Sequence, residues 1–522
     1  MDSEEREQRN AARRDRRANM SPAEWQETMD QRNTLDREHR ANMSQAEHQV
    51  ASQQQNTRRR VAQTARIGAQ VKAALNYSPQ DFIRPIDIGR MDKVFTHCDA
   101  LRFQNEPESI CCCNGKVKLD PIPDLPPQLR ELFLGPRNSH FLQNIRIYNS
   151  AFQMTSFGCK EARLPGWNPS FRIQGQLHHR LGSLLPNENE QPKFCQIYVI
   201  DSEQQLDARL RYFENMRRPI ANTIQTILHA SNKYVKSFKT ALELYNAHPE
   251  PECRAVISAE HRPAGAHQGR YNVPSNSEIA VLMPSEMPNS NRDIVLHKRN
   301  DSLQRVKETN KAYDPLQYPL FFPYGTDGWD ISMKLKHAVT GEPLLNKKLS
   351  PLMYYSHRIM MRRQGLNPLL YGKRLFQQYL VDQGCKVESE RMSFLYNNQS
   401  LLRSEQYDVY AETARTNEDG GRDIGRPVIL PASHTGSPRY MYAKQQDALA
   451  YVRAHGKPDL FITCTQDPNS PEISSELFEG QASYDRPDIG VRVFNQLNNV
   501  IVGDIKALTH LNGPHRGNPW DR

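Results

Sequence analysis

The chain has 522 residues, with 68 Lys plus Arg against 59 Asp plus Glu and a formal net charge of +9. Its length predicts two to four folded units at about 150 residues per domain, and the low hydrophobic content of 37% indicates that part of it stays solvated. No stretch approaches the roughly 18 apolar residues of a membrane helix, no apolar core of a secretory signal follows Met1, and nine Cys in so long a chain indicate a reducing compartment, not a disulfide framework.

Residues 1–72 differ in composition from the rest of the chain. They hold 13 Arg, no Lys before Lys72 and a single aromatic residue, Trp25, so they can be helical or disordered but cannot build a core. Within them, Arg-Ala-Asn-Met-Ser-Pro-Ala-Glu at 17–24 returns as Arg-Ala-Asn-Met-Ser-Gln-Ala-Glu at 40–47. On a helix a 23-residue period turns equivalent residues by about 140°, which disfavours a coiled-coil seam.

This Arg-rich unit of 23 residues resembles the score-and-three peptide repeat, a DNA-binding array. The resemblance implies that its arginines contact DNA phosphates. A solvated charged helix is the alternative, because 11 acidic residues within 1–66 offset the arginines. The arginines assigned to DNA by the first reading are Arg13, Arg14, Arg16, Arg17, Arg32, Arg37, Arg40, Arg58, Arg59 and Arg60.

The middle of the chain alternates between strand-like and helical patterns. The apolar run at 194–200 predicts a strand, and the apolar spacing within 201–247 predicts helices. Residues 248–312 read as polar loop around one strand at 279–283, and residues 351–415 as mostly helical.

The segment 428–510 predicts strand, helix, strand, helix. Ser437 followed by Pro438 is typical of a helix start, Gly456 of its end, and residues 459–465 of the next strand. Apolar neighbours favour core positions for five cysteines outside the N-terminal cluster: Cys159, Cys195, Cys253, Cys385 and Cys464.

Four long phrases carry a second resemblance. They are Tyr-Asp-Pro-Leu-Gln-Tyr-Pro-Leu-Phe-Phe-Pro-Tyr-Gly at 313–325, Arg-Leu-Phe-Gln-Gln-Tyr-Leu-Val-Asp at 374–382, the stretch 428–465, and Phe-Arg-Ile-Gln-Gly-Gln at 171–176 with His-Arg-Leu-Gly-Ser-Leu at 179–184. Together they resemble the helitron helicase-like domain of Helitron rolling-circle transposases over about residues 85–505. That family joins a replication-initiator endonuclease to a helicase.

The endonuclease implied by this resemblance needs three motifs. The first, Phe-x-Thr-x-Thr on a strand, is matched by Phe461, Thr463 and Thr465. The second, a His-x-His pair for a divalent metal, is absent, because no two of the 17 His are separated by one residue. The third is one or two nucleophilic Tyr, and Tyr484 is the single Tyr after Thr465.

The helicase signature is also missing from the sequence. No Gly-Lys pair stands in the Gly-x4-Gly-Lys-Ser/Thr pattern that cradles phosphates. We therefore expect no catalytic site in these residues, and a chain that ends before the catalytic His pair of its relatives.

A cysteine cluster lies near the start of the predicted Helitron-like region. Cys98, Cys111 and Cys112 resemble part of a zinc knuckle of the family, although Phe95 stands where the first Cys is expected. A structural zinc takes four ligands. The two alternatives are a weak zinc site and a vestigial cluster.

The sequence thus predicts an α+β protein with an Arg-rich helical or disordered N-terminus, a mixed central region and an incomplete β-α-β start of a replication-initiator-like endonuclease. The expected divisions are 1–72, 85–200, 201–312, 313–505 and a diverged or truncated tail, 506–522.

The expected function is that of a DNA-engaging fragment of a Helitron transposase in the nucleus. Its partner would be DNA, single-stranded or at transposon ends, with a full-length transposase in trans and no membrane. One alternative is a non-enzymatic nuclear DNA-binding protein acting through the repeats, and another is a gene fragment without a selected function.

Overall fold

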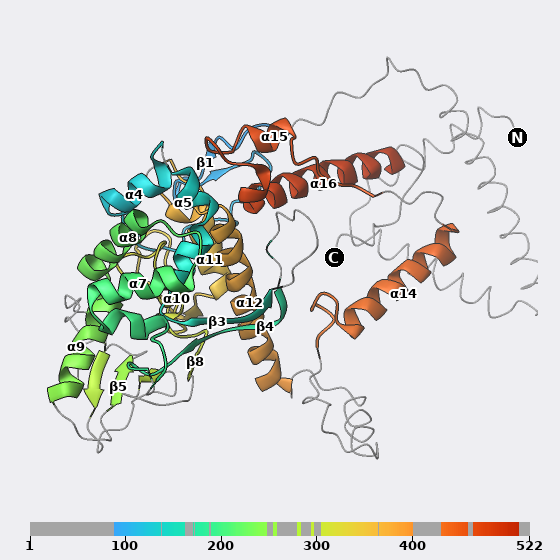
Figure 1. The fold of residues 1–522 in the computed structure, drawn as a ribbon. Helices are drawn as coiled ribbons and strands as arrows, with labels where there is room; N and C mark the ends of the chain where they lie inside the picture. The colour runs from blue at the N-terminus through green and yellow to red at the C-terminus, as the bar shows by residue number, and fades with distance from the viewer. Residues whose placement is uncertain are drawn as a thin grey trace, which may run out of the picture. The chain divides into compact units, whose positions relative to one another are not determined.

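The computed structural model describes residues 88–136, 138–161, 171, 173–186, 189–247, 254–257, 279–282, 294–296, 304–363, 365–399, 430–457 and 463–510. All of them belong to the second of two units, Ile86–Arg522. The arginine repeats and the first two residues of the segment 428–510, which was expected to open with a strand, lie outside the described residues. The elements of the second unit are drawn in Figure 1.

The fold class is α+β, as the sequence predicted. A short hairpin opens the described residues, and three helices follow it. Pro126 and Pro127 fix the start of the first helix, where the missing N–H of proline costs no hydrogen bond. These elements are β1 (Lys93–Val94), β2 (Leu101–Arg102), α4 (Pro127–Leu134), α5 (Ser139–Gln143) and α6 (Ile145–Phe152).

Two small antiparallel sheets follow. In the first, β4 (Ile173–Leu181) lies between β3 (Ser156–Glu161) and β8 (Gln304–Val306). In the second, β5 (Arg254–Ile257) lies between β6 (Ile279–Leu282) and β7 (Ile294–Leu296), which confirms the strand expected near 279–283.

The helices expected over 201–247 are present as α7 (Ser202–Tyr212), α8 (Arg218–Ser231) and α9 (Lys233–Ala247). The apolar residues at helical intervals bury one face of the helix as predicted, since Ile224 and Leu228 are buried one turn apart on α8.

The strand expected at 194–200 is wrong. Phe194–Val199 form a 3₁₀ helix, η2, in which the side chain of Gln196 turns back to accept the backbone N–H of Lys193 at 2.9 Å. Tyr198 closes this turn by donating its hydroxyl to the carbonyl of Phe152 at 2.5 Å. These side-chain contacts override the strand propensity of an apolar, β-branched run.

The region from 313 onward is mostly helical. A short hairpin separates its first helix from the others, and α12 is the long helix drawn in orange-brown in Figure 1. The elements are α10 (Tyr313–Gln317), β9 (Lys334–Lys336), β10 (Pro343–Lys348), α11 (Pro351–Ile359), η3 (Pro368–Tyr371) and α12 (Arg374–Asn397).

The C-terminal part holds α14 (Pro438–His455), α15 (Pro471–Ser474), η5 (Ser483–Asp485) and α16 (Pro487–His510). Ser437 caps α14 by accepting the N–H of Tyr440 at 3.0 Å, and Gly456 ends it at φ +90°, as predicted. The strand expected at 459–465 is wrong in its described part, because residues 463–467 carry no strand. The described residues of this segment hold its two expected helices, α14 and α16, and the β-α-β start of an endonuclease stays a prediction.

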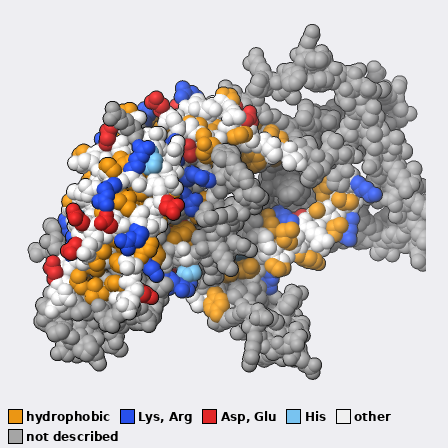
Figure 2. All heavy atoms as spheres, in the orientation of Figure 1, with side chains coloured by type: hydrophobic (Ala, Val, Ile, Leu, Met, Phe, Trp, Pro, Cys, Tyr) orange, Lys and Arg blue, Asp and Glu red, His pale blue; other side chains and the backbone are white. Residues whose placement is uncertain are grey.

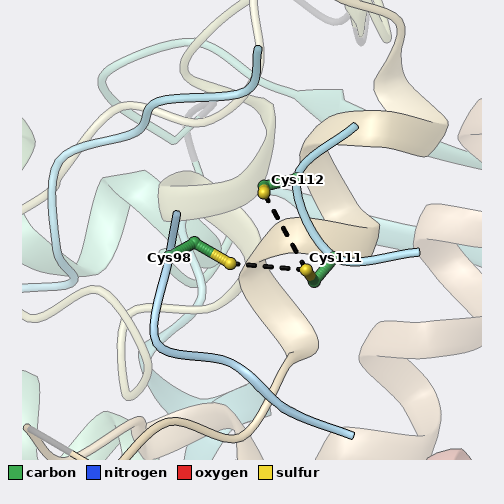
Figure 3. A group of neighbouring side chains, drawn as sticks. All are labelled: Cys98, Cys111 and Cys112. Atoms are coloured by element: carbon green, nitrogen blue, oxygen red, sulfur yellow. Dashed lines mark hydrogen bonds between the residues drawn. The ribbon is translucent and has the colours of Figure 1, made fainter. Parts of the chain in front are cut away.

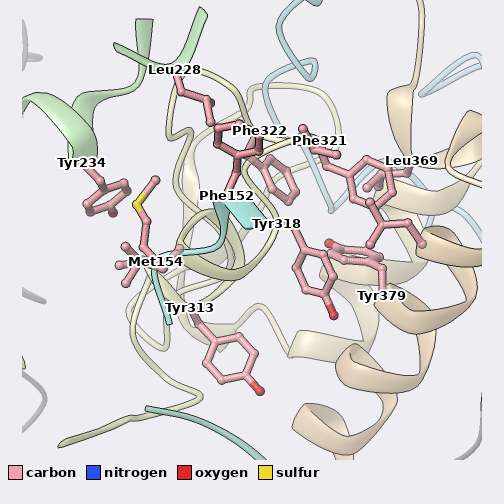
Figure 4. Packing of buried hydrophobic residues seen from close by; sticks show 14 of the residues in the cluster. Phe152, Met154, Leu228, Tyr234, Tyr313, Tyr318, Phe321, Phe322, Leu369 and Tyr379 are labelled. Carbon is pink, nitrogen blue, oxygen red and sulfur yellow. The ribbon is translucent and has the colours of Figure 1, made fainter. Parts of the chain in front are cut away.

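One hydrophobic core joins segments that are far apart in sequence. Tyr318 and Tyr379 pack edge to face with ring centroids 5.1 Å apart, which brings α12 against the chain after α10 (Figure 4). Phe321 stacks on Tyr318 with ring centroids 6.1 Å apart. Residues of two phrases that carried the family resemblance, 313–325 and 374–382, thus pack against each other in this core.

Helix α14 exposes apolar side chains along most of its length, as the orange side chains over it show in Figure 2. Met441 and Tyr442 are 58% and 63% exposed.

Candidate functional site

The three clustered cysteines meet in space. Cys98 lies in the turn after β1, and Cys111 and Cys112 lie in the loop before α4 (Figure 3). The Cys98 and Cys111 sulfurs are 3.4 Å apart, and those of Cys111 and Cys112 are 3.9 Å apart. All three sulfurs lie within 4.8 Å of one another. The sequence therefore named the right residues for this cluster.

A left-handed turn shapes the site. Cys113, Asn114 and Gly115 follow one another at φ values of 48°, 56° and 79°. The turn directs the Gly115 N–H to the sulfur of Cys112 at 3.2 Å. A side chain at Gly115 would meet the ring of His97 at 2.9 Å, so only glycine fits there.

The thiols influence one another's ionisation. Hydrogen bonds from Cys111 and Cys112 hold the pKa of Cys98 well below its usual range. The same sulfur contacts, together with burial, raise the pKa of Cys111. A thiolate is the form that binds metals, so the lowered pKa of Cys98 favours the form that a metal ion needs.

The donor set fits a soft metal ion. Thiolate sulfur is a preferred ligand of Zn²⁺, and Cys111 and Cys112 are buried where water competes little. Phe95 is buried and packs against the ring of His97, 5.5 Å away, so it leaves the place of a fourth cysteine filled by an apolar ring. The structure thus offers three ligands for a cation that takes four.

The structure describes only the second half of the Phe-x-Thr-x-Thr phrase. Thr463 and Thr465 are exposed and lie outside any strand, and Phe461 lies outside the described residues. Cys464 between them is exposed, which corrects its expected core position, and Cys385 is half-buried. Cys195 is buried as expected, while Cys159 and Cys253 fall outside what the structure describes for side chains.

A buried polar network, which sequence reasoning missed, links the resemblance phrases. Asp382 of α12 accepts the hydroxyls of Tyr313 and Tyr318, each at 2.8 Å. His179 of β4 lies 2.9 Å from the same carboxylate and stacks on Tyr313 at 4.0 Å. Its neighbour His178 is only half-buried, whereas His179 is fully buried.

A second buried ion pair lies one turn further along α12. Lys386 is 3.4 Å from Asp314 and donates to the hydroxyl of Tyr355 at 2.7 Å. Tyr355 in turn donates to Asp314 at 2.9 Å. Burial raises the pKa of Asp314 and lowers that of Lys386, so each charge depends on the other. Both groups are fully enclosed, which indicates a structural role.

The comparisons with known proteins identify one region of the chain. Residues 354–516 match the family model described as the Helitron helicase-like domain at the N-terminus. No curated protein matches the chain. Among the described residues no helix is both long and apolar enough to cross a membrane.

The matched region is built into the surrounding fold. It begins within α11 and includes α12. Tyr379 and Asp382 of α12 contact Tyr318, which lies outside the matched residues. Residues 354–516 of this chain form a Helitron helicase-like domain that shares one core with the segments before it.

Proposed function

We propose that this chain is the DNA-engaging part of a Helitron-type transposase that acts in rolling-circle transposition. The domain match at 354–516 is the observation that supports this function. The nucleic acid would be single-stranded DNA or transposon ends, because rolling-circle chemistry exposes a single strand, and the place of action would be the nucleus.

We propose further that these residues hold DNA without nicking it. No His-x-His pair occurs among the 17 His, and Thr463 and Thr465 are exposed outside a sheet. Tyr484 is 40% exposed and comes directly before α16, where it lacks the metal pair that activates a scissile phosphate. A full-length transposase in trans would then supply the cut.

The three-cysteine cluster is proposed as a zinc site that stabilises the loop before α4. Its support is the sulfur geometry, with the three thiols within 4.8 Å of one another. A structural metal site contributes folding free energy directly, so this role needs no catalytic step.

The test of DNA engagement uses the full chain. Fluorescence anisotropy with a labelled 30-nucleotide single strand and its duplex, each at 50 and 200 mM salt, measures affinity and salt slope. We expect the single strand to bind more tightly, with binding weakened by salt through counterion release. If the chain binds neither the single strand nor the duplex, the proposal is overturned. Incubating a supercoiled substrate with Mg²⁺ or Mn²⁺ and the chain alone should leave it uncut.

The 23-residue repeat favours a second candidate, a non-enzymatic DNA-binding protein that acts through residues 1–72. Deleting residues 1–72 from the full chain separates the two. If the repeats carry binding, the deletion removes most of the affinity and most of the salt slope. If the Helitron-like domain carries it, the shortened chain retains its preference for single strands.

A further inference from the structure

A cavity of about 660 Å³ opens beside the cysteine cluster. Its walls come from the loop at 97–101, the segment 117–122, the end of α11 with the residues that follow, and Phe478 after α15. This size lies within the range of small-ligand sites. The cavity lies where the Helitron-like domain meets the segments before it.

Cations outnumber carboxylates in the wall. The charged lining residues are Lys118, Arg358, Arg362 and Arg363, with Asp99 and Asp120. None of the four cations makes an ion pair within the part of the chain that the structure describes. With four cations against two carboxylates, the wall favours an anionic ligand.

Two of these arginines are fixed by the backbone. Arg362 donates to the carbonyls of Cys98 and His357, each at 3.0 Å. Arg358 donates to the carbonyl of Asp120 at 2.6 Å. Because a carbonyl carries no net charge, these hydrogen bonds fix both guanidinium groups without neutralising them. Arg363 is exposed and Lys118 is half-buried, so these two can reach a ligand.

An aromatic platform forms another part of the wall. Tyr371 and Phe478 stack with their rings 4.4 Å apart and 3° from parallel, and Arg486 lies 5.2 Å over Phe478. The stack holds Tyr371 in place before any ligand arrives. Rings beside cations are the pattern by which proteins bind single-stranded nucleic acid, the ring stacking on a base and the cation meeting a phosphate.

A buried polar atom in the wall has no partner. His357 is 8% exposed, lines the cavity, and its Nδ1 makes no hydrogen bond among the described residues. Burial, together with Arg362 and Arg358, lowers the pKa of His357 to about 3, so the imidazole is neutral at pH 7. A neutral ring offers one N–H and one acceptor, which suits the edge of a base.

We propose that this cavity binds one nucleotide of single-stranded DNA, with the phosphate on Lys118 and Arg363 and the base against Tyr371. The inference rests on the proposed function and names the place where the strand is held. A duplex presents stacked, paired bases and cannot insert one into a cavity without unpairing it.

The experiment compares two doubly substituted full-length chains of equal charge. Lys118→Glu/Arg363→Glu reverses two cations of the cavity, and Arg211→Glu/Lys236→Glu reverses two exposed cations on α7 and α9. With a labelled oligothymidylate we expect the cavity variant to bind at least tenfold more weakly than the control. The slope of log K against log salt concentration should be smaller in magnitude by about 1.4, because two phosphate contacts are lost.

Tyr371→Leu provides a second measurement that does not alter charge. We expect about five- to a hundredfold weaker binding of the single strand with an unchanged salt slope, since stacking is lost and phosphate contacts remain. Thermal melting of each variant checks that it is folded.

The outcomes separate the two proposals. If the unsubstituted chain fails to bind any DNA, the proposed function fails. If it binds and the cavity and control variants bind equally, the function stands and the cavity assignment is overturned. If dTMP competes as well as the oligonucleotide at equal nucleotide concentration, the cavity takes a free nucleotide, which also overturns strand binding.

Discussion

Arg492 of α16 holds Glu106, 386 residues earlier in the chain, in a two-pronged ion pair. The Nε–Oε1 and Nη2–Oε2 distances are 2.7 and 2.5 Å, and Glu106 is only 4% exposed. Glu106 also accepts the N–H of Phe103 at 2.9 Å. This pair fastens the loop after β2 to the C-terminal helix.

Replacing Arg492 should destabilise the fold. Arg492→Met leaves Glu106 buried without a counter-charge, and we expect a loss of about 3–5 kcal/mol in the free energy of unfolding, measured by urea denaturation. Adding Glu106→Gln removes the stranded charge and keeps an acceptor for Phe103. The double variant should regain most of the loss; equal loss in both variants would show that the pair is not what holds the segments together.

The Asp314–Lys386 pair leads to a related prediction with a pH signature. Lys386→Met should cost about 3–5 kcal/mol at pH 7, because Asp314 stays buried and unpaired. Without Lys386 the pKa of Asp314 rises further, so the folded state binds a proton that the unfolded state releases above about pH 4. The cost should therefore shrink as the pH falls toward 4.

Asp314→Asn/Lys386→Met is the matched control. The amide can still accept from Tyr355, so this variant should be more stable than Lys386→Met at pH 7 and show no comparable pH dependence. A cost for Lys386→Met that stays constant from pH 7 to pH 4 would contradict the buried-charge explanation.

Local signals in the sequence predicted the helices and one cluster. Ser437 and Gly456 marked the ends of α14, because a helix end depends on a few neighbouring residues. The start needs a side chain that caps the first N–H groups, and the end needs a residue that tolerates a positive φ. The closeness of Cys98 and Cys111 could be expected because only 13 positions separate them, and a short loop can bring two such residues together.

Long-range contacts could not be predicted in the same way. The partners of Asp382 lie 64 and 69 residues away at Tyr318 and Tyr313, and no local pattern specifies them. The phrases at 313–325 and 374–382 marked a family but did not reveal that their polar residues bond to each other. The apolar run at 194–200 misled because the side-chain contacts of Gln196 and Tyr198 outweigh its strand propensity.

His229 should make the free energy of unfolding depend on pH below neutrality. Its Nε2 donates to Gln205 and its Nδ1 accepts from Lys239, each at 2.8 Å. Burial, then the charges of Lys239 and Arg209, lower the pKa of His229 to about 4. Between that value and about 6.5 the unfolded state binds more protons, so stability should fall as the pH drops through this window.

Two substitutions of this site test the prediction by urea denaturation from pH 7 to 4.5. His229→Gln removes the titrating ring, so its stability should vary less with pH than that of the unsubstituted chain. Lys239→Met removes one of the positive charges that lower the pKa of His229 but leaves the ring buried. The pH range over which stability falls should therefore become narrower but not disappear. Parallel pH curves for all three proteins would refute a role for His229.

The cysteine cluster should bind zinc through all three sulfurs. Cys111→Ser replaces the central sulfur, 3.4 and 3.9 Å from its neighbours, and should abolish retention of Zn²⁺ after dialysis, measured as metal content per chain. Cys113→Ser is the matched control, because Cys113 lies in the same loop and outside the cluster. Chelator treatment should lower the melting temperature of the unsubstituted chain and of Cys113→Ser but not of Cys111→Ser, since only bound metal adds to stability. Equal metal content in the three proteins would assign the cluster to packing alone.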